Sequence, residues 1–316
     1  VQVVKEAATL GDVVVLGSLN MDLIVRTERI PRPGETVHGH GFDMVPGGKG
    51  ANQAAAAARL GAHVTMLGRV GHDRFGQALL DNMLMQGVEA GHIVQDRREP
   101  TGIALIQVQE DGENSIVVAP GANARVSQAD VEQATPLIWG ASFLVCQFEI
   151  PLDVVRHGIQ VAASKGVPVV LNPAPAYPVD TEFLEGVYCL VVNETEATSL
   201  SEINVIDLDS ARTAAIELQA VGVPVVIVTL GEQGALLVGE GKPLHIPARR
   251  VHAVDTTAAG DAFIGGLVAS LDRGMDLVDA VDYATCAGTL ATTILGAQTS
   301  LPDKAAVDAF YREART

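Results

Sequence analysis

The sequence predicts an α/β fold with a doubly wound, mostly parallel sheet flanked by helices, together with a small separate β-sheet. Three observations support this prediction. Short apolar segments alternate along the chain with segments of helical periodicity. The apolar segments are continuous and rich in β-branched residues, as is typical of parallel strands buried on both faces. Further strand-like segments interrupt the alternation and lie near prolines or a hairpin signal, which sets them apart from the main sheet.

The main sheet is predicted from apolar segments that cover residues 13–16, 64–67, 143–146, 167–171, 188–192 and 225–229. Helices are predicted between them, for example over residues 77–85, 153–164 and 211–221. Alternation of strands and helices in this order is typical of a doubly wound sheet. Such a sheet binds its ligands outside the carboxyl ends of its strands, so we expect functional residues in the loops that follow them.

The small sheet is predicted from residues 23–27, 35–45, 102–109 and 115–119. Asp111-Gly112 lies between the last two of these segments and is a strong signal for a hairpin turn. His38 and His40 are two residues apart on one predicted strand, so we expect them to share a face. Two histidines are too few for a metal site, and we expect them to meet solvent or an interface instead.

Composition limits the partners that the chain can have. The chain has 316 residues, of which 48% are hydrophobic, and we expect one domain over residues 1–316. A formal net charge of −17 argues against binding to nucleic acid or to anionic membranes, and no apolar run is long enough for a transmembrane helix. Cys146, Cys189 and Cys286 are widely spaced, which indicates neither a zinc site nor a disulfide framework and favours a reducing, cytoplasmic setting.

A run of small residues before an apolar helix is the first candidate site. Ala258, Ala259 and Gly260 precede a helical pattern that begins near Phe263. The first turn of a helix has unpaired N–H groups and the positive end of the helix dipole, so small residues there let an anion approach. Asp261 adds a carboxylate beside this anion site. Phosphoryl transfer needs donors for the phosphoryl oxygens and a base for the attacking hydroxyl, although an aspartate is also favourable in any first helical turn.

A second glycine-rich segment, residues 46–53, precedes an alanine-rich helix that we expect over residues 54–60. Its glycines allow close approach of the backbone to a ligand, although one such loop can also be a tight turn before a helix. The segment is not a Walker A motif, because Gly50 follows Lys49 where Ser or Thr is required. The turn after the first strand also lacks the G-x-G-x-x-G pattern expected of an NAD-dependent oxidoreductase.

With these segments in place, the chain resembles the ribokinase branch of the ribokinase/PfkB family of carbohydrate kinases from about Asp12 to its C-terminus. The resemblance rests on motifs in the family's order, which are Gly17-Ser18-Leu19-Asn20-Met21-Asp22, Pro33-Gly34-Glu35-Thr36, Gly47-Gly48-Lys49-Gly50-Ala51-Asn52-Gln53, Asn172-Pro173-Ala174-Pro175-Ala176, Asn193-Glu194-Thr195-Glu196, Thr229-Leu230-Gly231 and residues 255–261. It implies a sugar kinase that uses ATP, with a β-sheet lid over about residues 23–45 and 99–119 through which such kinases often form homodimers.

The resemblance also implies roles for individual residues. Asp261 would be the catalytic base, and the backbone N–H groups of Ala258, Ala259 and Gly260 would form an anion hole. The sugar would be bound by Asn20, Asp22, Gly48, Lys49, Asn52, Glu149 and Asp261. The nucleotide would be bound by Asn193, Thr229, Gly231, Gly234 and Gly260. Magnesium (Mg²⁺) would be placed, largely through water, by Asn193 and Glu196. A monovalent cation, usually potassium (K⁺), would be bound by Asp255, Thr257, Ala291, Ile294, Gly296 and Ser300.

The function that the resemblance implies is transfer of the γ-phosphoryl group of ATP to the 5-hydroxyl of D-ribose. A kinase of 2-deoxyribose or of another related sugar is the alternative, because small changes in a pocket alter substrate preference by only a few kcal/mol. A catalytically silent sugar- or nucleotide-binding protein is a more remote alternative, since Asp261 and both glycine-rich segments are intact. Many relatives have Gly where Ala258 stands, but backbone donation does not depend on that side chain.

Overall fold

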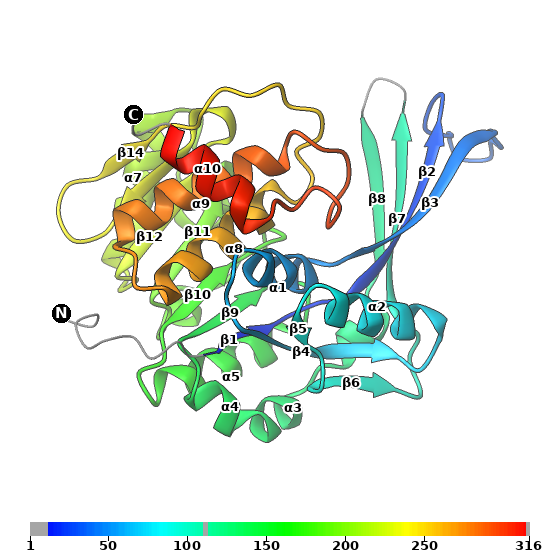
Figure 1. Cartoon of the computed structure of the whole chain (residues 1–316), viewed down its shortest axis with the longest axis horizontal. Helices are drawn as coiled ribbons and strands as arrows, with labels where there is room; N and C mark the ends of the chain where they lie inside the picture. Colours follow the sequence, from blue (N-terminus) through cyan, green and yellow to red (C-terminus); the bar gives the residue numbers. More distant parts are fainter. Residues whose placement is uncertain (1–11, 110–112, 314–316) are drawn as a thin grey trace.

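A large sheet crosses the body of the molecule in the computed structural model, which describes residues 12–109 and 113–313 (Figure 1). The order of its strands is β14-β13-β12-β11-β10-β9-β1-β4-β5, with β6 paired to β4. These strands are β1 (Val13–Leu16), β4 (Val64–Gly71), β5 (Val88–Glu89), β6 (Ile93–Asp96), β9 (Phe143–Gln147), β10 (Val169–Asn172), β11 (Cys189–Asn193), β12 (Val225–Thr229), β13 (Ala235–Val238) and β14 (Leu244–Ile246). The start of the chain, residues 1–11, and the expected hairpin turn at Asp111-Gly112 lie outside the described residues.

The strands from β12 to β5 pair in parallel, while β13 and β14 run antiparallel at one edge. The predicted doubly wound, mostly parallel sheet is therefore confirmed. Each predicted strand is present, with small shifts at its ends. The strand predicted to start at Val167 starts at Val169 instead, because Pro168 has no N–H group to donate to the ladder.

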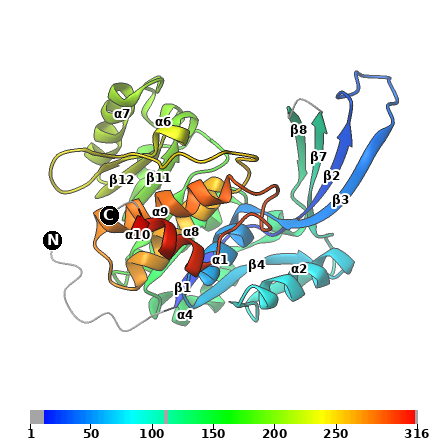
Figure 2. The same cartoon turned by 45° about the horizontal axis from the view of Figure 1, so that its top comes forward.

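Helices cover both faces of the large sheet (Figure 2). One face carries α1 (Lys49–Arg59), α2 (Arg74–Met85), α8 (Ala259–Asp272), α9 (Leu277–Ala291) and α10 (Lys304–Glu313). The other carries α3 (Gln128–Gln133), α4 (Thr135–Trp139), α5 (Leu152–Ala163), α6 (Glu194–Ser201) and α7 (Leu208–Ala220). Short 3-10 helices are η1 (Gly121–Arg125), η2 (Thr181–Leu184) and η3 (Gly231–Gln233). Among the described helices, none combines the length and the apolar character that a membrane crossing requires.

The side chains of β1 show why the main strands have continuous apolar sequences. Val13 and Val15 pack in the core between the sheet and α1, α8 and α9, whereas Val14 and Leu16 pack in the core on the other face. Successive side chains of a strand point to opposite faces. Because both faces are covered by helices, every residue of β1 is buried and apolar.

Helix α1 begins at Lys49, earlier than expected. The alanines alone predicted the helix, but Gly48, with a φ of 88°, lets the chain turn directly into it. Lys49, Asn52 and Gln53 therefore lie at its start. Helix α1 also packs closely on α8, where a β-carbon on Gly265 would come within 2.4 Å of α1. Packing this close transmits strain from one helix to the other.

Four strands form a second sheet, called here the small sheet, which projects from the body in Figures 1 and 2. Its strand order is β3-β2-β7-β8. Its strands are β2 (Asn20–Thr27), β3 (Gly39–Gly47), β7 (Gly102–Gln109) and β8 (Asn114–Ala119). The prediction of a small sheet apart from the core is confirmed.

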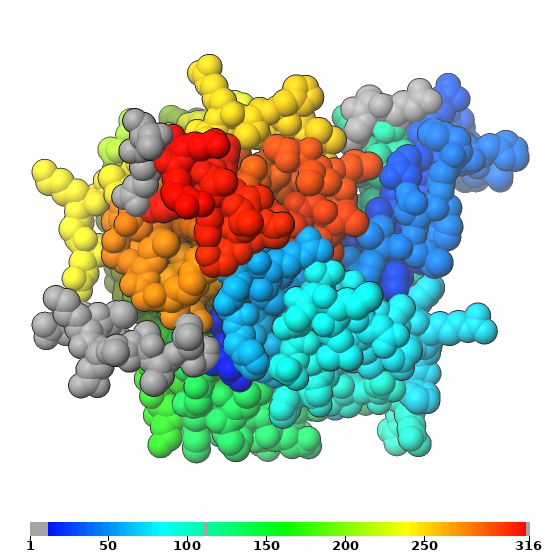
Figure 3. Space-filling model, viewed as in Figure 1, coloured from blue at the N-terminus to red at the C-terminus, as the bar shows by residue number. Residues whose placement is uncertain are grey.

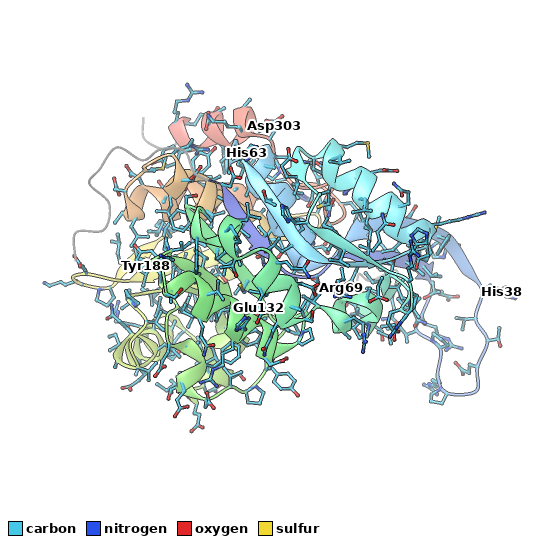
Figure 4. The ribbon with its side chains drawn as sticks, turned by 90° about the horizontal axis from the view of Figure 1, so that it is seen from below. His38, His63, Arg69, Glu132, Tyr188 and Asp303 are labelled. Atoms are coloured by element: carbon cyan, nitrogen blue, oxygen red, sulfur yellow. The ribbon has the colours of Figure 1, made fainter. Side chains whose placement is uncertain are left out.

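The second predicted strand of the small sheet starts later than expected. Strand β3 begins at Gly39, because Gly39 pairs with Thr27, the last residue of β2, and the chain before it extends past the end of β2. Within that preceding segment the carboxylate of Glu35 accepts a hydrogen bond of 3.0 Å from the N–H of Arg32. His38 therefore precedes the strand, and the expectation that His38 and His40 share a strand face is wrong. Figure 4 places His38 at the far end of the projecting small sheet.

The two faces of the small sheet differ. Residues paired across its ladders share a face, so Asp22 lies with Val45, Ala104 and Val118 on what we call the inner face. The opposite, outer face carries Leu23, Val25, Phe42, Met44, Leu105 and Val117. Four of these outer side chains are exposed by 46% to 61%, namely Phe42, Met44, Leu105 and Val117. Large apolar side chains are therefore exposed to solvent on this face.

Candidate active site

The glycine-rich segment before α1 lies against the start of β2. A β-carbon on Gly47 would lie 2.2 Å from Oδ2 of Asp22, and one on Gly48 would lie 2.8 Å from the backbone nitrogen of Asn20. At Gly48 the close atoms are backbone and φ is 88°, so glycine is required there, whereas at Gly47 an added side chain would displace the carboxylate of Asp22. The approach brings the polar residues of β2 beside the first turn of α1, which carries Lys49.

Asp261 is buried in the first turn of α8. Its Oδ2 accepts a hydrogen bond of 2.9 Å from Nδ2 of Asn52, and its Oδ1 accepts one of 3.0 Å from Nε2 of Gln53. Burial raises the pKa of Asp261 above its usual value, while Lys49 and the two amides partly oppose this rise. A carboxylate with a raised pKa is suited to accept a proton near neutral pH.

A chain of side-chain amides fixes Gln53 in this position. Nε2 of Gln147 donates to Oε1 of Gln53 at 2.7 Å, and Nε2 of Gln53 also donates to Oδ1 of Asn172 at 3.1 Å. Nδ2 of Asn172 donates in turn to Oε2 of Glu196 at 3.4 Å. Sequence reasoning assigned no role to Gln147 or Asn172. Both are the last residues of buried strands, and a polar residue at that position is a signal that could have identified them.

Lys49 is the basic group of the site. Burial lowers its pKa, but Asp261, Glu149 and Glu196 raise it more strongly together, so the net shift is upward and the ammonium group stays charged. For Asp22, burial raises the pKa, and Glu149 and Asp261 raise it further, to about 7. The site thus gathers several carboxylates around one lysine.

Glu149 supports the glycine-rich segment. Its Oε2 accepts a hydrogen bond of 2.5 Å from Oγ of Ser18 and one of 3.0 Å from the N–H of Lys49. The N–H of Lys49 is one of the first in α1, where no intrahelical acceptor exists, so a carboxylate is favourable there. Glu149 therefore has a role in positioning α1, and its predicted contact with the sugar stays a prediction.

Asn20 is held by a residue that sequence reasoning did not identify. Nδ2 of Asn123 donates to Oδ1 of Asn20 at 2.8 Å and to the carbonyl of Leu19 at 3.0 Å. The N–H of Leu19 donates back to Oδ1 of Asn123 at 2.9 Å. With its oxygen engaged in this way, Asn20 presents its Nδ2 as a donor. Asn123 lies in η1, outside every motif, so no signal in the sequence marked it.

A cavity of about 200 Å³ opens beside Asp261. It is lined by Lys49, Asn172, Ala174, Val191, Val192, Asn193, Glu196, Thr229, Thr256, Ala258, Gly260, Asp261 and Ile264. The structure thus brings together residues that were predicted separately for the sugar, the nucleotide and magnesium. Gly231 and Gly234 lie outside this lining. A β-carbon on Gly234 would lie 2.1 Å from the carbonyl oxygen of Ile246, so the packing of this turn itself requires glycine, and the nucleotide role of both residues stays a prediction.

The predicted anion hole lies at the start of α8. A β-carbon on Gly260 would have no neighbour within 4 Å, so its backbone is open to a ligand. Its N–H belongs to the first helical turn, where no intrahelical acceptor exists. The N–H of Ala259 donates to the carbonyl of Thr256 at 3.2 Å, so in this arrangement that N–H already has an acceptor within the protein. Ala258 has a φ of 58°, a left-handed conformation that favours glycine.

Asn193 and Glu196 form a capping box at the start of α6. Oδ1 of Asn193 accepts a hydrogen bond of 2.8 Å from the N–H of Glu196, and Oε2 of Glu196 accepts one of 3.0 Å from the N–H of Asn193. Both residues also line the cavity, so capping and ligand contact are compatible. Within the described part of the chain, no group of three or more His, Cys, Asp or Glu side chains is arranged to hold a metal ion. A metal ion beside Glu196 would take most of its ligands from water and substrate.

Asp255 joins the two segments that were predicted to hold a monovalent cation. Its Oδ1 accepts a hydrogen bond of 2.9 Å from the N–H of Thr257, and its Oδ2 accepts one of 2.8 Å from the N–H of Gly296. These bonds bring Asp255, Thr257 and Gly296 together. Ile294 is 52% exposed, and Oγ of Ser300 donates to a carbonyl of its own turn at 2.8 Å.

Known proteins resemble this chain in sequence and in structure. A ribokinase from Haemophilus influenzae is 40% identical over 290 residues, which cover 92% of this chain and 95% of the relative. A deoxyribokinase from Salmonella typhi is 37% identical over 292 residues, which cover 92% of this chain and 95% of the relative. The structure of Arabidopsis thaliana ribokinase complexed with ribose and ATP matches with a TM-score of 0.89 and 31% identity, over 96% of this chain and 99% of that chain.

A family model gives the same result. The model described as pfkB family carbohydrate kinase matches residues 10–304, which is most of the chain. The relatives also align over nearly their whole lengths, so the likeness is not limited to one motif. The resemblance inferred from the sequence motifs is therefore confirmed. This chain belongs to the pfkB family of carbohydrate kinases.

Proposed function

We propose that this chain transfers the γ-phosphoryl group of ATP to the 5-hydroxyl of D-ribose and releases ribose 5-phosphate and ADP. The observation that carries the proposal is the position of Asp261, a buried carboxylate at the start of α8 between two amides of α1 and the cavity. The similarity to ribokinases, one of them described as complexed with ribose and ATP, supports the choice of substrates.

The sugar would lie between the first turn of α1 and the inner face of the small sheet, which would act as a lid. Oδ1 of Asn52 is buried and has no hydrogen-bond partner among the described residues, and a sugar hydroxyl would satisfy it. Asp22 offers acceptor oxygens, and Asn20 offers a donor. Donors and acceptors in this mixture suit a polyhydroxy ligand. Gly48, Lys49 and Glu149 would complete this set.

Asp261 would accept the proton of the 5-hydroxyl while that oxygen attacks the γ-phosphorus. A bond forms between the sugar oxygen and phosphorus, the bond from phosphorus to the β,γ-bridging oxygen breaks, and its electron pair leaves with ADP. The N–H of Gly260 and the ammonium group of Lys49 would stabilise charge on the transferred group. Asn52 and Gln53 hold the carboxylate in place beforehand, so little reorganisation is needed.

A divalent cation fits beside Glu196. Lys49 is the one basic residue among those that line the cavity, so the charge of ATP needs further compensation. Asn193 and Glu196 offer oxygen ligands at the cavity wall, and Mg²⁺ prefers oxygen ligands and keeps several waters. When bound, Mg²⁺ would neutralise phosphate charge.

A monovalent cation fits beside Asp255. Helix α9 ends at Ala291, and a helix C-terminus presents unpaired carbonyl groups and the negative end of the helix dipole. The other proposed ligands, Thr257, Ile294, Gly296 and Ser300, would contribute mainly carbonyl oxygens, and such oxygens can replace the hydration shell of K⁺. When bound, the cation would add positive charge near the start of α8.

We also propose that the chain forms a homodimer through the outer face of the small sheet. The exposed apolar residues Phe42, Met44, Leu105 and Val117 lie together on that face, and a second copy would remove them from water. We further propose a cytoplasmic location, which is supported by the three cysteines, all free and buried.

The second candidate substrate is 2-deoxyribose, because a deoxyribokinase is 37% identical over 92% of this chain. An assay of ADP release with ribose, 2-deoxyribose, fructose and adenosine, each with ATP, Mg²⁺ and K⁺, separates the candidates. We expect the highest kcat/KM for ribose. A preference for 2-deoxyribose would keep Asp261 in its role and change the substrate. Sugar binding without turnover of any compound would point to a silent binding protein.

A further inference from the structure

The loop between α9 and α10, residues 292–303, is fastened to α1 and α2 by side chains that the proposed reaction does not use. We call it the cation loop, because it carries three of the proposed K⁺ ligands. Nδ2 of Asn82 in α2 donates to Oε1 of Gln298 at 2.6 Å, and Nη1 of Arg59 at the end of α1 donates to the carbonyl of Leu301 at 2.6 Å. Figure 3 shows this C-terminal segment lying against the blue and cyan surface of α1 and α2.

Gln86 connects the two contacts. Nε of Arg59 donates to Oε1 of Gln86 at 2.7 Å, and Nε2 of Gln86 donates to Oδ1 of Asn82 at 3.4 Å. Asn82 and Gln298 are 8% and 3% exposed. Nε2 of Gln298 is buried without a hydrogen-bond partner among the described residues. Because an unpaired buried donor lowers stability, stability alone is a poor explanation for glutamine at this position.

The other side of the cation loop contacts the segment that leads into α8. The N–H of Gly296 donates to Asp255 at 2.8 Å. The carbonyl of Thr292 accepts hydrogen bonds from the N–H groups of Val254, at 2.7 Å, and Asp255, at 3.1 Å. Gln298 follows shortly after Gly296 in the chain, so the bond from α2 anchors the loop directly beside its contact with Asp255.

Helix α1 extends from this anchor to the sugar side of the site. Its start carries Lys49, Asn52 and Gln53, and its last residue is Arg59. A helix of this length spans about 16 Å at about 1.5 Å per residue. Because α1 packs tightly on α8, the two helices form a rigid reference for both ends of the site. Asp261 lies on α8, so a contact that fixes the cation loop relative to α1 also fixes it relative to Asp261.

We propose that Asn82 and Gln298 are positioning residues that hold the cation loop in its binding arrangement before the cation arrives. This inference rests on the monovalent cation of the proposed function. A loop that is already fixed pays less ordering entropy when it binds a ligand. Without the bond, the contacts of Asp255 and Arg59 remain, but the loop between them samples more arrangements, and its affinity for K⁺ falls.

Asn82→Leu and Gln298→Met each remove the bond. We expect the K⁺ concentration for half-maximal activity to rise by about fivefold or more, the low end of coupling between sites, while the KM for ribose stays unchanged. A second readout needs no turnover, since the rise in Tm when LiCl is replaced by KCl should shrink in both variants. Gln77→Ala is the matched control, because it removes an exposed bond of 2.8 Å to Asp81 on the same helix. It should leave both readouts at their wild-type values.

A lower Tm in both variants with unchanged K⁺ constants would overturn the inference, since Asn82 and Gln298 would then serve stability alone. The double variant Asn82→Leu/Gln298→Met keeps the test valid if a single variant misfolds, because it removes the paired groups and the unpaired Nε2 together. A wild type whose activity and Tm ignore K⁺ would overturn the cation site, and this inference with it. A wild type that responds to K⁺, with variants that match it, would contradict this inference alone.

Discussion

The two walls of the proposed sugar site are built in different ways. On the body side, Asp261 is buried and fixed by hydrogen bonds from Asn52 and Gln53, and further amides fix Gln53. On the side of the small sheet, burial and two neighbouring carboxylates raise the pKa of Asp22, with nothing to offset them, and the outer face exposes apolar side chains. The body wall therefore already fixes its carboxylate in the free protein, whereas the small sheet carries a carboxylate with a raised pKa on one face and exposed apolar side chains on the other.

The largest effect is expected on the body wall. Asp261→Asn keeps the size of the side chain and removes the base, so we expect kcat to fall by about 10²- to 10⁴-fold. Sugar affinity, measured by calorimetry, should change little. Asp209→Asn is the control, since Asp209 lies on the surface of α7 with its side chain 88% exposed. Normal turnover by Asp261→Asn would remove Asp261 from the role of base.

On the inner face of the small sheet, Asp22→Ala should affect binding more than chemistry. Loss of an acceptor for sugar hydroxyls is expected to weaken ribose binding by about 10- to 100-fold, while ATP binding stays near its wild-type value. Calorimetry with each substrate separately measures both. Equal losses for ribose and ATP would count against a specific contact between Asp22 and the sugar.

On the outer face, Met44→Asp should prevent dimer formation without changing the sugar site, which lies on the inner face. A charge in the centre of an apolar interface is costly to bury, so sedimentation should show a monomer at concentrations where the wild type is a dimer. Leu84→Asp is a matched control on α2, because Leu84 is 60% exposed and Met44 is 58% exposed. A wild type that sediments as a monomer at every concentration would reject the dimer.

The smallest expected effect concerns stability and pH. The pKa of Asp22 is raised from 3.8 to about 7 in the folded chain, so between these values the unfolded chain loses a proton that the folded chain keeps. The contribution of Asp22 to stability is therefore most favourable below about pH 4, falls as pH rises toward 7, and stays low above it. Asp22→Asn cannot ionise. We expect its Tm to exceed that of the wild type by a few degrees at about pH 8 and to match it near pH 3.5.

A Tm difference between Asp22→Asn and the wild type that does not change with pH would show that Asp22 keeps an ordinary pKa. Ribose binding provides the control in the same samples. The variant should gain stability at high pH and lose sugar affinity. The buried carboxylate of Asp22 destabilises the free protein when it is ionised, and the same carboxylate is the proposed acceptor for the sugar.

Much of the fold could be predicted because its causes are local. Strands β1 and β12 have the predicted ends, since each is a short β-branched run that is buried on both faces. Glycines in the sequence likewise indicate where two backbone segments approach closely, as Gly47 and Gly48 do against the start of β2. Short motifs also marked residues 46–53 and 258–261 as candidate site segments, although α1 and α8 begin earlier than their apolar patterns indicated, at Lys49 and Ala259.

What could not be predicted depends on contacts between distant parts of the chain. Asn123 supports Asn20 across 103 positions, and no pattern around η1 reveals that contact. Gln298 meets Asn82 across 216 positions. The late start of β3 also depends on its partner, because β2 ends at Thr27, which pairs with Gly39. Sequence patterns identify the groups that do chemistry more readily than the groups that hold them.

The central claim is that the 5-hydroxyl of the sugar lies at Asp261 and receives the phosphoryl group. Phosphorus NMR of the products formed from ribose and from 5-deoxyribose tests it most directly. We predict one phosphate monoester, on carbon 5 of ribose, and no product from 5-deoxyribose, which should still bind and inhibit competitively. Phosphorylated 5-deoxyribose, or ribose that carries the phosphate on another carbon, would contradict the claim.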